Sequence, residues 1–368
     1  MMNVPFVDLK IQYQSIKPEI DAAVKNVIDN TAFVGGKNVE AFEQAFAGKF
    51  GAKHCISCAN GTDAIYISLK ALGIGPGDEV ITAANTFIAT SEAVSQTGAK
   101  PVFVDIDEYF HINPALIEKK ITKKTRAIVP VHLFGQPAAI DAIKRISDAH
   151  GLPLIEDCAQ SHFASSGGRP TGTFGLAGTF SFYPGKNLGA YGDAGAVITS
   201  DDDFARKVRL FASHGSLKKF VHEIEGVNSR MDALQAVVLS AKLPHIDDWN
   251  KARHAHGLKY NALLSDISDV KCPKLRDNAF HIFHVYCLRV PKRDELAENL
   301  KSRGISTGIH YPVALPFMPA YGYLKHKPAD FPVAHECMGE ILSLPMYPEL
   351  SDGQIEYVAQ AIKDFYAK

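Results

Sequence analysis

The sequence predicts an α/β protein of two domains: a large domain over residues 1–248 with a mixed, mainly parallel sheet, and a smaller α+β domain over residues 249–368. The chain length of 368 residues exceeds the usual size of one domain. Up to about residue 200, short and nearly all-apolar runs alternate with stretches of helical periodicity, which is typical of a sheet covered by helices on both faces. Near residue 245 this alternation ends.

The strands of the large domain are expected where apolar runs are bounded by turn signals or helical stretches. The helix over residues 62–72 is well marked, because Ile65, Leu69 and Leu72 share one face. The expected strands are residues 52–58, 79–82, 100–104, 126–131, 152–156, 178–182 and 194–199. Ligands of such sheets bind beyond the carboxyl ends of the strands, so the side chains that follow these runs are the candidates for function.

The chain leaves the large domain through a long amphipathic pattern, residues 231–243 and on to residue 264. We place the boundary at residue 248, inside this expected connecting helix. After it we expect a strand over residues 282–290, a helix over 294–303 and a strand over 306–310, followed by helices to the end. This succession predicts the α+β arrangement of the smaller domain.

Composition and charge exclude several classes of function. A net charge of −1 with only short basic pairs provides no electrostatic footprint for nucleic acid. No apolar run reaches the ~18 residues of a membrane span, and the N-terminus lacks the basic and then apolar regions of a signal peptide. Six cysteines in a chain of this length do not form a disulfide framework, so we expect a protein of the reducing cytoplasm.

Two polar side chains follow expected strands in a combination that carries chemistry. Residues 178–189 read as a short strand that ends in a Pro-Gly turn carrying Lys186, and residues 152–160 form an apolar run that delivers Asp157. A pyridoxal phosphate (PLP) enzyme needs such a pair. The lysine forms a Schiff base with the cofactor's aldehyde, and the carboxylate keeps the pyridine nitrogen protonated.

A nicotinamide-dependent oxidoreductase is the competing class of enzyme. It needs a glycine-rich loop between a strand and a helix. Residues 73–77 (Gly-Ile-Gly-Pro-Gly) follow a helix and precede a strand, which is the reverse order, and the strand-to-helix turn at residues 60–62 has a single glycine. The pattern therefore favours the PLP enzyme.

The turn at residues 60–63 (Asn-Gly-Thr-Asp) is the candidate phosphate site. Gly61 allows close approach of a ligand to the backbone at a helix N-terminus, and Thr62 offers a hydroxyl. A plain helix cap is the alternative. Ser181 either makes a second contact to the phosphate or is a serine with only a structural role in the strand.

Two further residues are candidates for contacts to the cofactor ring. Phe87 follows an expected strand and either stacks on the pyridine or fills the core. Gln160 either reaches the phenolic oxygen of the ring or is a solvated loop amide.

Cysteine and histidine residues give no metal site. Cys55 and Cys58 form a C-x-x-C pair without a second such pair and lie at the end of an expected strand, so we expect structural thiols. His281 and His284 flank a strand-like run without a matching third ligand, and we expect both to be structural.

Five ordered segments resemble the DegT-type (DegT/DnrJ/EryC/StrS) nucleotide-sugar aminotransferases. These are PLP enzymes of fold type I, the aspartate aminotransferase fold. The resemblance runs from residue 4 almost to the C-terminus, in order and at compatible spacing. The segments are residues 60–64 (NGTDA), 156–160 (EDCAQ), 181–189 (SFYPGKNLG), 227–232 (VNSRMD) and 343–346 (SLPM).

The resemblance implies a role for each candidate residue. Lys186 becomes the Schiff-base lysine, Asp157 the partner of the pyridine nitrogen, Gln160 a neighbour of the phenolic oxygen and Phe87 a neighbour of the ring face. The phosphate is then held by Gly61, Thr62 and Ser181.

The resemblance also implies a homodimer, in which Asn228 reaches the phosphate of the neighbouring subunit. Arg230 is placed to meet the nucleotide's diphosphate. Phe163 departs from the family pattern, in which a small residue follows the histidine, so the role of His162 stays open. The residues that line the sugar site are then Tyr183, His310 and Tyr311.

Within the family, residues 158–162 and 186–196 resemble the enzymes that aminate C3, whereas the C4 enzymes more often have Thr-Thr-Gly-Glu-Gly-Gly after their lysine. The resemblance thus implies transfer of an amino group from L-glutamate to the C3 keto group of a nucleotide-linked 3-keto hexose, for cell-surface glycan or O-antigen synthesis. A dTDP-3-keto-6-deoxyhexose and a UDP-2-acetamido-3-keto-uronic acid both fit. A C4-aminotransferase and a non-catalytic regulatory member are the alternatives, whereas a related dehydratase carries histidine in place of Lys186.

Overall fold

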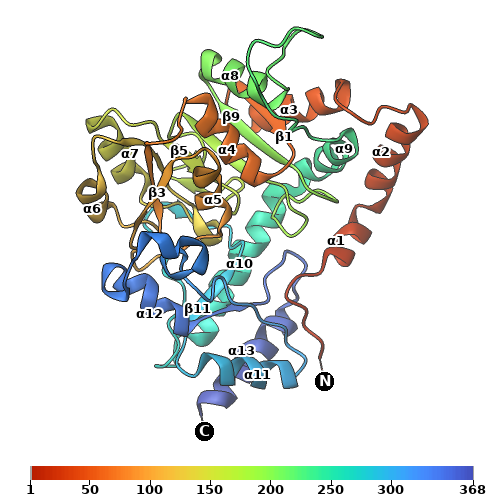
Figure 1. Cartoon of the computed structure of the whole chain (residues 1–368). Coiled ribbons are helices and arrows are strands. Elements are labelled where there is room, and N and C mark those ends of the chain that lie inside the picture. The colour runs from red at the N-terminus through yellow and green to blue at the C-terminus, as the bar shows by residue number, and fades with distance from the viewer. Residues whose placement is uncertain (1, 368) are drawn as a thin grey trace.

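The structure, a computed structural model, describes residues 2–367 and is built around one composite β-sheet (Figure 1). Two groups of strands, in the orders β1-β9-β8-β5 and β3-β2-β4, are joined by parallel bridges from Ile128 to Leu154 and from Val131 to Asp157. The strands are β1 (His54–Cys58), β2 (Glu79–Ala83), β3 (Lys100–Val104), β4 (Thr125–Val129), β5 (Ile155–Asp157), β8 (Ala177–Ser181) and β9 (Gly195–Thr199).

The sheet is mixed and mainly parallel, as predicted. Strands β2 and β3, β2 and β4, and β5 and β8 pair in parallel, whereas β9 runs antiparallel to both of its neighbours, β1 and β8. Strands of this kind are buried on both faces, which explains why the sequence shows them as nearly continuous apolar runs.

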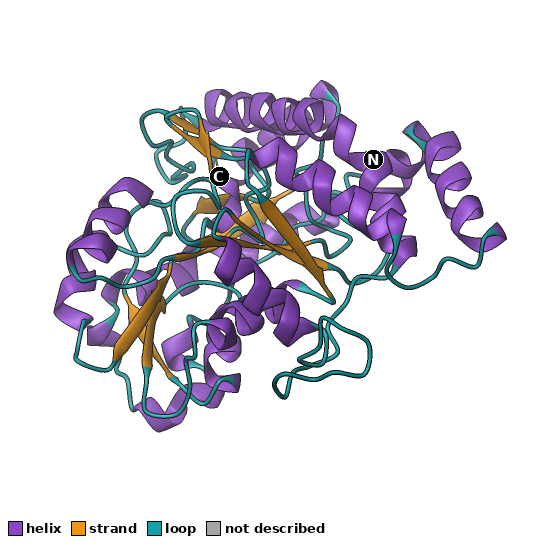
Figure 2. Cartoon of the chain, turned by 90° about the horizontal axis from the view of Figure 1, so that it is seen from above, coloured by secondary structure: helices purple, strands orange, loops and turns teal. Residues whose placement is uncertain are grey.

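Alternate residues of the strands point into two separate cores. Ile56 and Val197 face the core that α4 and α8 cover, whereas Cys55 and Ile198 face the core that α3 and α9 cover. Figure 2 shows strands with helices on both sides. The helices of this part are α3 (Lys37–Phe50), α4 (Gly61–Ala71), α5 (Ala89–Gln96), α6 (Pro114–Ile117), α7 (Ile140–Ala149), α8 (Asp202–Ala212) and α9 (Ala233–Lys242).

Aromatic packing holds α3 against the sheet. Phe42, Phe46 and Phe50 recur every four residues, so they share the buried face of the helix. They contact Phe180 and Phe182 at ring-centroid distances from 5.0 to 5.4 Å. Burial of each such ring contributes about 2 kcal/mol to stability.

The C-terminal part packs around α10 (Ile246–Leu264), which descends from the sheet in Figure 1. Its small sheet pairs β11 (Tyr286–Arg289) with β12 (Ile341–Leu344) in antiparallel register. The helices of this part are α11 (Arg293–Ser302), α12 (Pro332–Glu340) and α13 (Asp352–Tyr366). The smaller elements of the chain are β6 (Ser165–Ser166), β7 (Arg169–Pro170), β10 (Ala279–Phe280) and the 3₁₀ turns η1 (Glu118–Lys120), η2 (Leu133–Gly135), η3 (Leu243–His245), η4 (Leu315–Phe317), η5 (Pro319–Leu324) and η6 (Pro328–Asp330).

The N-terminal segment returns to this C-terminal part. Val4 bridges to Ile305 in parallel, donates its N–H to the carbonyl of Gly304 and accepts from the N–H of Ser306, both at 2.9 Å. Helices α1 (Leu9–Ser15) and α2 (Lys17–Asp29) follow, and α2 packs on α9. Among the described residues, every helix is too short or too polar to span a bilayer.

Several expected elements differ from the structure. The strand expected over residues 282–290 is limited to Tyr286–Arg289, because Ile282 and Val285 donate their N–H groups to the carbonyls of Gly135 and Phe134. Residues 306–310 form no strand and make one bridge, from Gly308 to Ser343. Strand β12 replaces part of the expected helical region. The 3₁₀ turn η3, which contains Pro244, interrupts the expected helix between α9 and α10. The division of the chain at residue 248 stays a prediction.

Candidate active site

A cavity of about 560 Å³ lies beyond the carboxyl ends of β5 and β8. Its walls come from distant parts of the chain, including Phe6 near the N-terminus, Arg253 on α10 and Met346 after β12. Most of the predicted site residues meet here, namely Gly61, Thr62, Phe87, Asp157, Gln160, Ser181, Tyr183, Lys186, His310 and Tyr311.

Lys186 lies in the turn after β8, where its N–H donates to the carbonyl of Tyr183 at 2.8 Å. Burial lowers the pKa of the Lys186 amine from 10.5 to about 8, and the charge of Asp157 opposes this effect. A lowered pKa makes the neutral amine available near physiological pH, and only the neutral amine acts as a nucleophile or accepts a proton.

Asp157 ends β5 and is buried. Thr90 donates from Oγ1 to Oδ2 of Asp157 at 2.7 Å, and the N–H of Ala159 donates to Oδ1 at 3.1 Å. Burial raises the pKa of this carboxyl, while the two hydrogen bonds and Lys186 lower it. A buried carboxylate that faces a cavity is suited to hold a cationic ring nitrogen.

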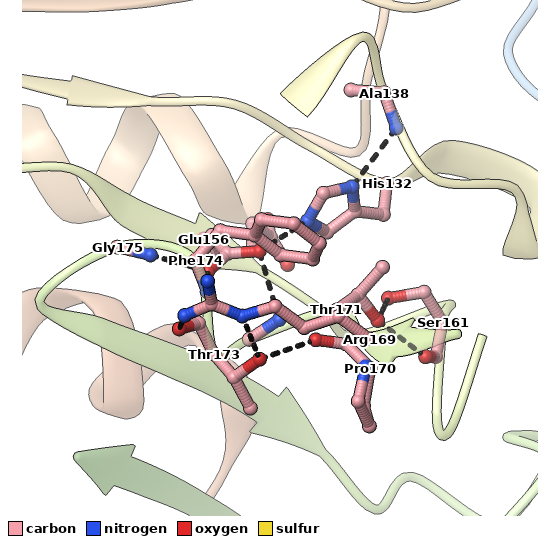
Figure 3. A network of polar contacts seen from close by, with 12 residues as sticks. His132, Ala138, Glu156, Ser161, Arg169, Pro170, Thr171, Thr173, Phe174 and Gly175 are labelled. Carbon is pink, nitrogen blue, oxygen red and sulfur yellow. Dashed lines mark hydrogen bonds and ion pairs between the residues drawn. The ribbon is translucent and has the colours of Figure 1, made fainter. Parts of the chain in front are cut away.

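The preceding residue, Glu156, anchors the end of β5 (Figure 3). Its fully buried carboxylate accepts N–H groups from Gly172, Phe174 and Gly175 at 2.7–2.8 Å, and the Nε2–H of His132 at 2.9 Å. The N–H of Ala138 donates to Nδ1 of His132, which fixes the ring proton on Nε2. This network holds the main chain beside Asp157 in one position.

The same network accounts for a cluster of three metal-ligating side chains. One ligand atom each of His132, Glu156 and Cys158 lies within 4.8 Å of the others. N–H groups already occupy both oxygens of Glu156 and both nitrogens of His132 are engaged, so the arrangement is explained without an ion. Cys55 and Cys58 lie buried in β1, where burial raises the pKa of both thiols, as befits structural cysteines.

The start of α4 forms another part of the cavity wall. Asn60 caps the helix through its Oδ1, which accepts the N–H of Asp63 at 2.8 Å. A side chain at Gly61 would place its Cβ 2.5 Å from Cβ of Ser181, so only glycine permits this close approach. The hydroxyl-bearing residues Thr62 and Ser181 therefore flank one helix N-terminus, which suits an anion.

Gln160 is a buried residue and not a solvated loop amide. Its Oε1 accepts the N–H of Phe134 at 2.7 Å, so its amide group points Nε2 toward the hydroxyl of Tyr311 at 3.1 Å. Burial raises the pKa of Tyr311, which keeps the phenol protonated. Phe87 is half-exposed beside Tyr311, with ring centroids 5.6 Å apart, and is therefore free to contact a ligand.

Two predicted residues do not line this cavity. Asn228 and Arg230 are exposed and lie on the segment after the loop that protrudes from α8 at the top of Figure 1. Ser229 between them is buried, and its Oγ donates to Asp63 at 2.6 Å and accepts the N–H of Ala59 at 3.1 Å. The segment is thus anchored on α4 while the two predicted side chains point to its surface.

The expectation that His284 is structural is wrong, because this residue lines the cavity. Arg253 does so too, with its Nη1 held by main-chain carbonyls of Phe283, His284 and Met346. Local sequence does not distinguish either residue as functional, because Arg253 lies in an ordinary helical pattern and His284 in a strand-like run. Thr90, which bonds Asp157, was also not predicted, although it lies only three residues after the predicted Phe87.

His162 is fully buried between Phe180 and Phe182, and both of its ring nitrogens lack a hydrogen-bond partner among the described residues. Burial lowers the pKa of this histidine to about 3, so the ring is neutral. His281, by contrast, is buried outside the cavity and accepts the N–H of Phe283 through Nδ1, which agrees with a structural role.

The residues present fit pyridoxal phosphate. Lys186 offers an amine with a lowered pKa, Asp157 a buried carboxylate, and the Gly61–Ser181 contact an anion cradle that a Cβ would fill. Gln160 turns its amide donor into the same cavity. Each chemical part of the cofactor thus has a matching group.

Comparisons with known proteins agree with this fit. A family model described as the DegT/DnrJ/EryC1/StrS aminotransferase family matches residues 14–363. The chain is 48% identical to a "Pleiotropic regulatory protein" of Geobacillus stearothermophilus, with 99% of each chain covered. It is 41% identical to a dTDP-3-amino-3,4,6-trideoxy-alpha-D-glucose transaminase of Streptomyces venezuelae (99% of this chain, 96% of the relative). It is 40% identical to a UDP-2-acetamido-2-deoxy-3-oxo-D-glucuronate aminotransferase of Pseudomonas aeruginosa (98% and 99%).

Solved structures show the same fold. The S. venezuelae protein DesV, solved in complex with a ketimine intermediate, matches with a TM-score of 0.98 at 41% identity over 100% of both chains. NtdA of Bacillus subtilis, solved with bound cofactor PMP, matches with a TM-score of 0.92 at 29% identity over 100% of this chain and 86% of that one.

Proposed function

Because the chain belongs to the DegT/DnrJ/EryC1/StrS aminotransferase family, we propose that it transfers an amino group from L-glutamate to the C3 keto group of a nucleotide-linked 3-keto hexose. The observation that carries this proposal is that Lys186 and Asp157 line one cavity together with an anion cradle. The fold is that of the fold type I PLP enzymes, and the cofactor is pyridoxal phosphate.

Bound PLP supplies the electron sink that stabilises negative charge on the donor's α-carbon. Asp157 holds the ring nitrogen in its protonated form, the state in which the ring withdraws most charge. With the amino donor bound, the Lys186 amine would carry the proton from the donor's α-carbon to the cofactor. Its lowered pKa suits this task, because an acid–base group works best when its pKa lies near the working pH.

The phosphate is assigned to the start of α4. Main-chain N–H groups at Gly61 and Thr62 and the hydroxyl of Ser181 are the donors. Gln160 would donate to the phenolic oxygen, and Phe87 would contact the ring face. Tyr183, His310 and Tyr311 are assigned to the sugar. His310 is held for this by Ser343, whose Oγ lies 2.9 Å from Nδ1, and by Phe6, on which its ring stacks at 5.5 Å.

The active protein is proposed to be a homodimer with shared sites. The loop between α8 and Asn228 exposes a group of apolar side chains that a single chain leaves in solvent, namely Leu217, Phe220, Val221 and Ile224. An exposed apolar group of this kind marks a protein interface. Asn228 follows it directly and is proposed to reach the phosphate of the second subunit, with Arg230 facing the diphosphate.

The choice of C3 follows from the sequence after Lys186 and is supported by relatives of about 40% identity whose names specify 3-amino or 3-oxo sugars. The products would serve cell-surface glycan or O-antigen synthesis in the cytoplasm. A regulatory role is the second candidate, and the relative at 48% identity bears a regulatory name. A protein that acts only as a regulator has no need of Lys186, Asp157 and Gln160 in one cavity.

The deciding experiment incubates the purified PLP-loaded protein with L-glutamate and either a dTDP-3-keto-6-deoxyhexose or a UDP-2-acetamido-3-keto-glucuronate. Mass spectrometry of the sugar product is expected to show replacement of oxygen by an amino group for one of the two. A 4-keto sugar is the control. Amination of the 4-keto sugar alone would move the proposal to C4, and amination of none would favour the regulatory role.

A further inference from the structure

The structure places an unassigned hydrogen-bond acceptor in the wall of the cavity. His284 precedes β11 and lines the cavity that contains Lys186. Its Nδ1 lies 3.0 Å from Oδ1 of Asn187, the residue that follows the lysine. Which of the two ring nitrogens carries the proton decides what His284 offers to a ligand, and a chain of hydrogen bonds determines it.

The chain begins at two main-chain carbonyls, which can only accept. Asn250 on α10 donates from Nδ2 to the carbonyl of His162 at 2.9 Å, so its Oδ1 is left to accept. Asn187 donates from Nδ2 to this Oδ1 at 2.9 Å and to the carbonyl of Ile282 at 3.4 Å. The orientation of both amide groups follows from these partners.

Oδ1 of Asn187 therefore faces His284, and an amide oxygen can only accept. The proton must lie on Nδ1 of His284. Burial lowers the pKa of His284 well below its usual range, and the positive charges of Lys186 and Arg253 lower it further, so the ring is neutral. A neutral imidazole with its proton on Nδ1 presents a bare lone pair on Nε2.

The charges around His284 select the ligand group that this lone pair receives. Lys186 and Arg253 both act on His284 electrostatically, and the carboxylates of Asp157 and Glu349 act in turn on these two cations. A neutral O–H group brings no charge beside these groups and supplies the donor that the lone pair of Nε2 lacks.

We propose that Nε2 of His284 accepts a hydrogen bond from a hydroxyl group of the bound hexose, and that Asn187 holds His284 in the tautomer required for this contact. The inference rests on the proposed function, because it takes the cavity to hold a nucleotide-linked hexose. It assigns to the residue after the Schiff-base lysine a part in substrate recognition, through His284.

Binding to the cofactor-free protein tests the proposal without turnover. The probes are dTDP-glucose and UDP-N-acetylglucosamine, and the affinity of each is measured by isothermal titration calorimetry. His284→Asn keeps a donor near Asn187 but does not reach the position of Nε2, whereas His284→Gln places an amide oxygen there. His254→Gln, on α10 outside the cavity, is the matched control.

For the probe that binds the wild type, His284→Asn is expected to weaken binding about tenfold, the size of one hydrogen bond. His284→Gln is expected to retain most of the affinity, and His254→Gln all of it. Circular dichroism checks that each variant is folded. Equal affinities of the wild type and His284→Asn would overturn the proposal.

A second measurement separates substrate recognition from an effect on Lys186. L-Glutamate alone converts the cofactor of the PLP-loaded enzyme, which is followed by absorbance and involves no sugar. His284→Asn is expected to slow this conversion by a smaller factor than the factor by which it weakens binding of the sugar probe. Slowing by an equal or larger factor would overturn the proposal in favour of a role in positioning Lys186. If the wild type binds neither probe, the hydrogen bond proposed for His284 fails, and the amination assay decides the proposed function separately. If it binds a probe as described but aminates no keto sugar, the proposed function alone fails.

Discussion

Ser229 donates a hydrogen bond of 2.6 Å to Oδ2 of Asp63 and thereby ties the segment that carries Asn228 and Arg230 to the first turn of α4. The same turn begins with Gly61 and Thr62, which line the cavity. This hydrogen bond therefore joins the proposed cofactor cradle of one subunit to the segment whose side chain is proposed to reach the other cradle.

Loss of this contact tests its importance. Ser229→Ala removes the donor to a carboxylate and the acceptor for the N–H of Ala59, leaving both without their partner. We expect the dissociation constant for PLP to rise about tenfold and the melting temperature to fall. Absorbance titration and thermal unfolding measure the two effects. Ser265→Ala, whose Oγ bonds only the carbonyl of Ala262 at an exposed site, is the control. An unchanged affinity for PLP would show that the contact is not needed for the cradle.

Capture of PLP by Lys186 is expected to depend on pH. Because the pKa of the amine is lowered to about 8, the rate of covalent attachment to the cofactor-free protein should rise as the pH rises through about 8 and then level off. Lys186→Ala should lose the link and all transamination. Lys242 is a second buried lysine whose pKa is lowered to about 8, so it serves as an internal comparison. Borohydride reduction followed by peptide mass spectrometry should mark Lys186, and a mark on Lys242 would refute the assignment.

Asp157→Asn should separate catalysis from stability. Turnover is expected to fall by about a hundredfold or more, because the neutral amide no longer favours the protonated ring. Burial raises the pKa of Asp157 in the folded state, so its contribution to stability is present below the unfolded pKa and is lost as the pH rises through the folded value. The cofactor-free variant should therefore have a larger free energy of unfolding than the wild type at pH 7. The difference between the two proteins should be smaller at pH 4. Urea titrations at the two pH values measure this. Near-normal turnover would exclude the proposed role.

The shared site can be tested by mixing subunits. Lys186→Ala and Asn228→Asp are each expected to be inactive, the second because its new charge repels the phosphate. In a mixed dimer one of the two sites would contain neither substitution, so activity should return after subunit exchange. Exchange is followed with two differently tagged chains. If exchange occurs and no activity returns, Asn228 serves its own subunit.

Glu156→Gln is expected to lower stability by about 3 kcal/mol. The carboxylate receives N–H groups on both oxygens, so the amide of glutamine must turn its own N–H₂ against one pair of donors. Urea unfolding of the cofactor-free protein measures the loss. Glu118→Gln, on the exposed surface, is the control. If the free energy of unfolding falls no more than it does for Glu118→Gln, then water or a shifted side chain replaces the lost hydrogen-bond partner.

Much of the large sheet could be predicted because its strands are short apolar runs with clear ends. The expected strand over residues 100–104 coincides with β3, and the strand over residues 79–82 differs from β2 by one residue. The expected strand over 152–156 begins too early, since β5 starts at Ile155 after Pro153, which has no N–H for the ladder.

The missed parts of the site depend on contacts between residues far apart in the chain. His284 reaches the cavity through a bend, and its acceptor character follows from Asn187 and Asn250, which lie 97 residues and 34 residues before it. No local pattern contains that information. Lys186, Asp157 and Gly61 could be predicted because each stands at the end of a strand or the start of a helix, where local sequence and chemistry coincide.

The pairing of Val4 with Gly304 and Ser306 has a consequence for the order of events during synthesis on the ribosome. The hydrogen bonds of Val4 can form only after roughly 300 further residues have been added, which takes tens of seconds at about 5–20 residues per second. Phe6 stays unplaced for the same time, and His310 and Met346 emerge later still. The nascent chain can build most of its large sheet during this interval, but it has no complete pocket to load. The cavity as described is therefore complete only after residue 346 has been added.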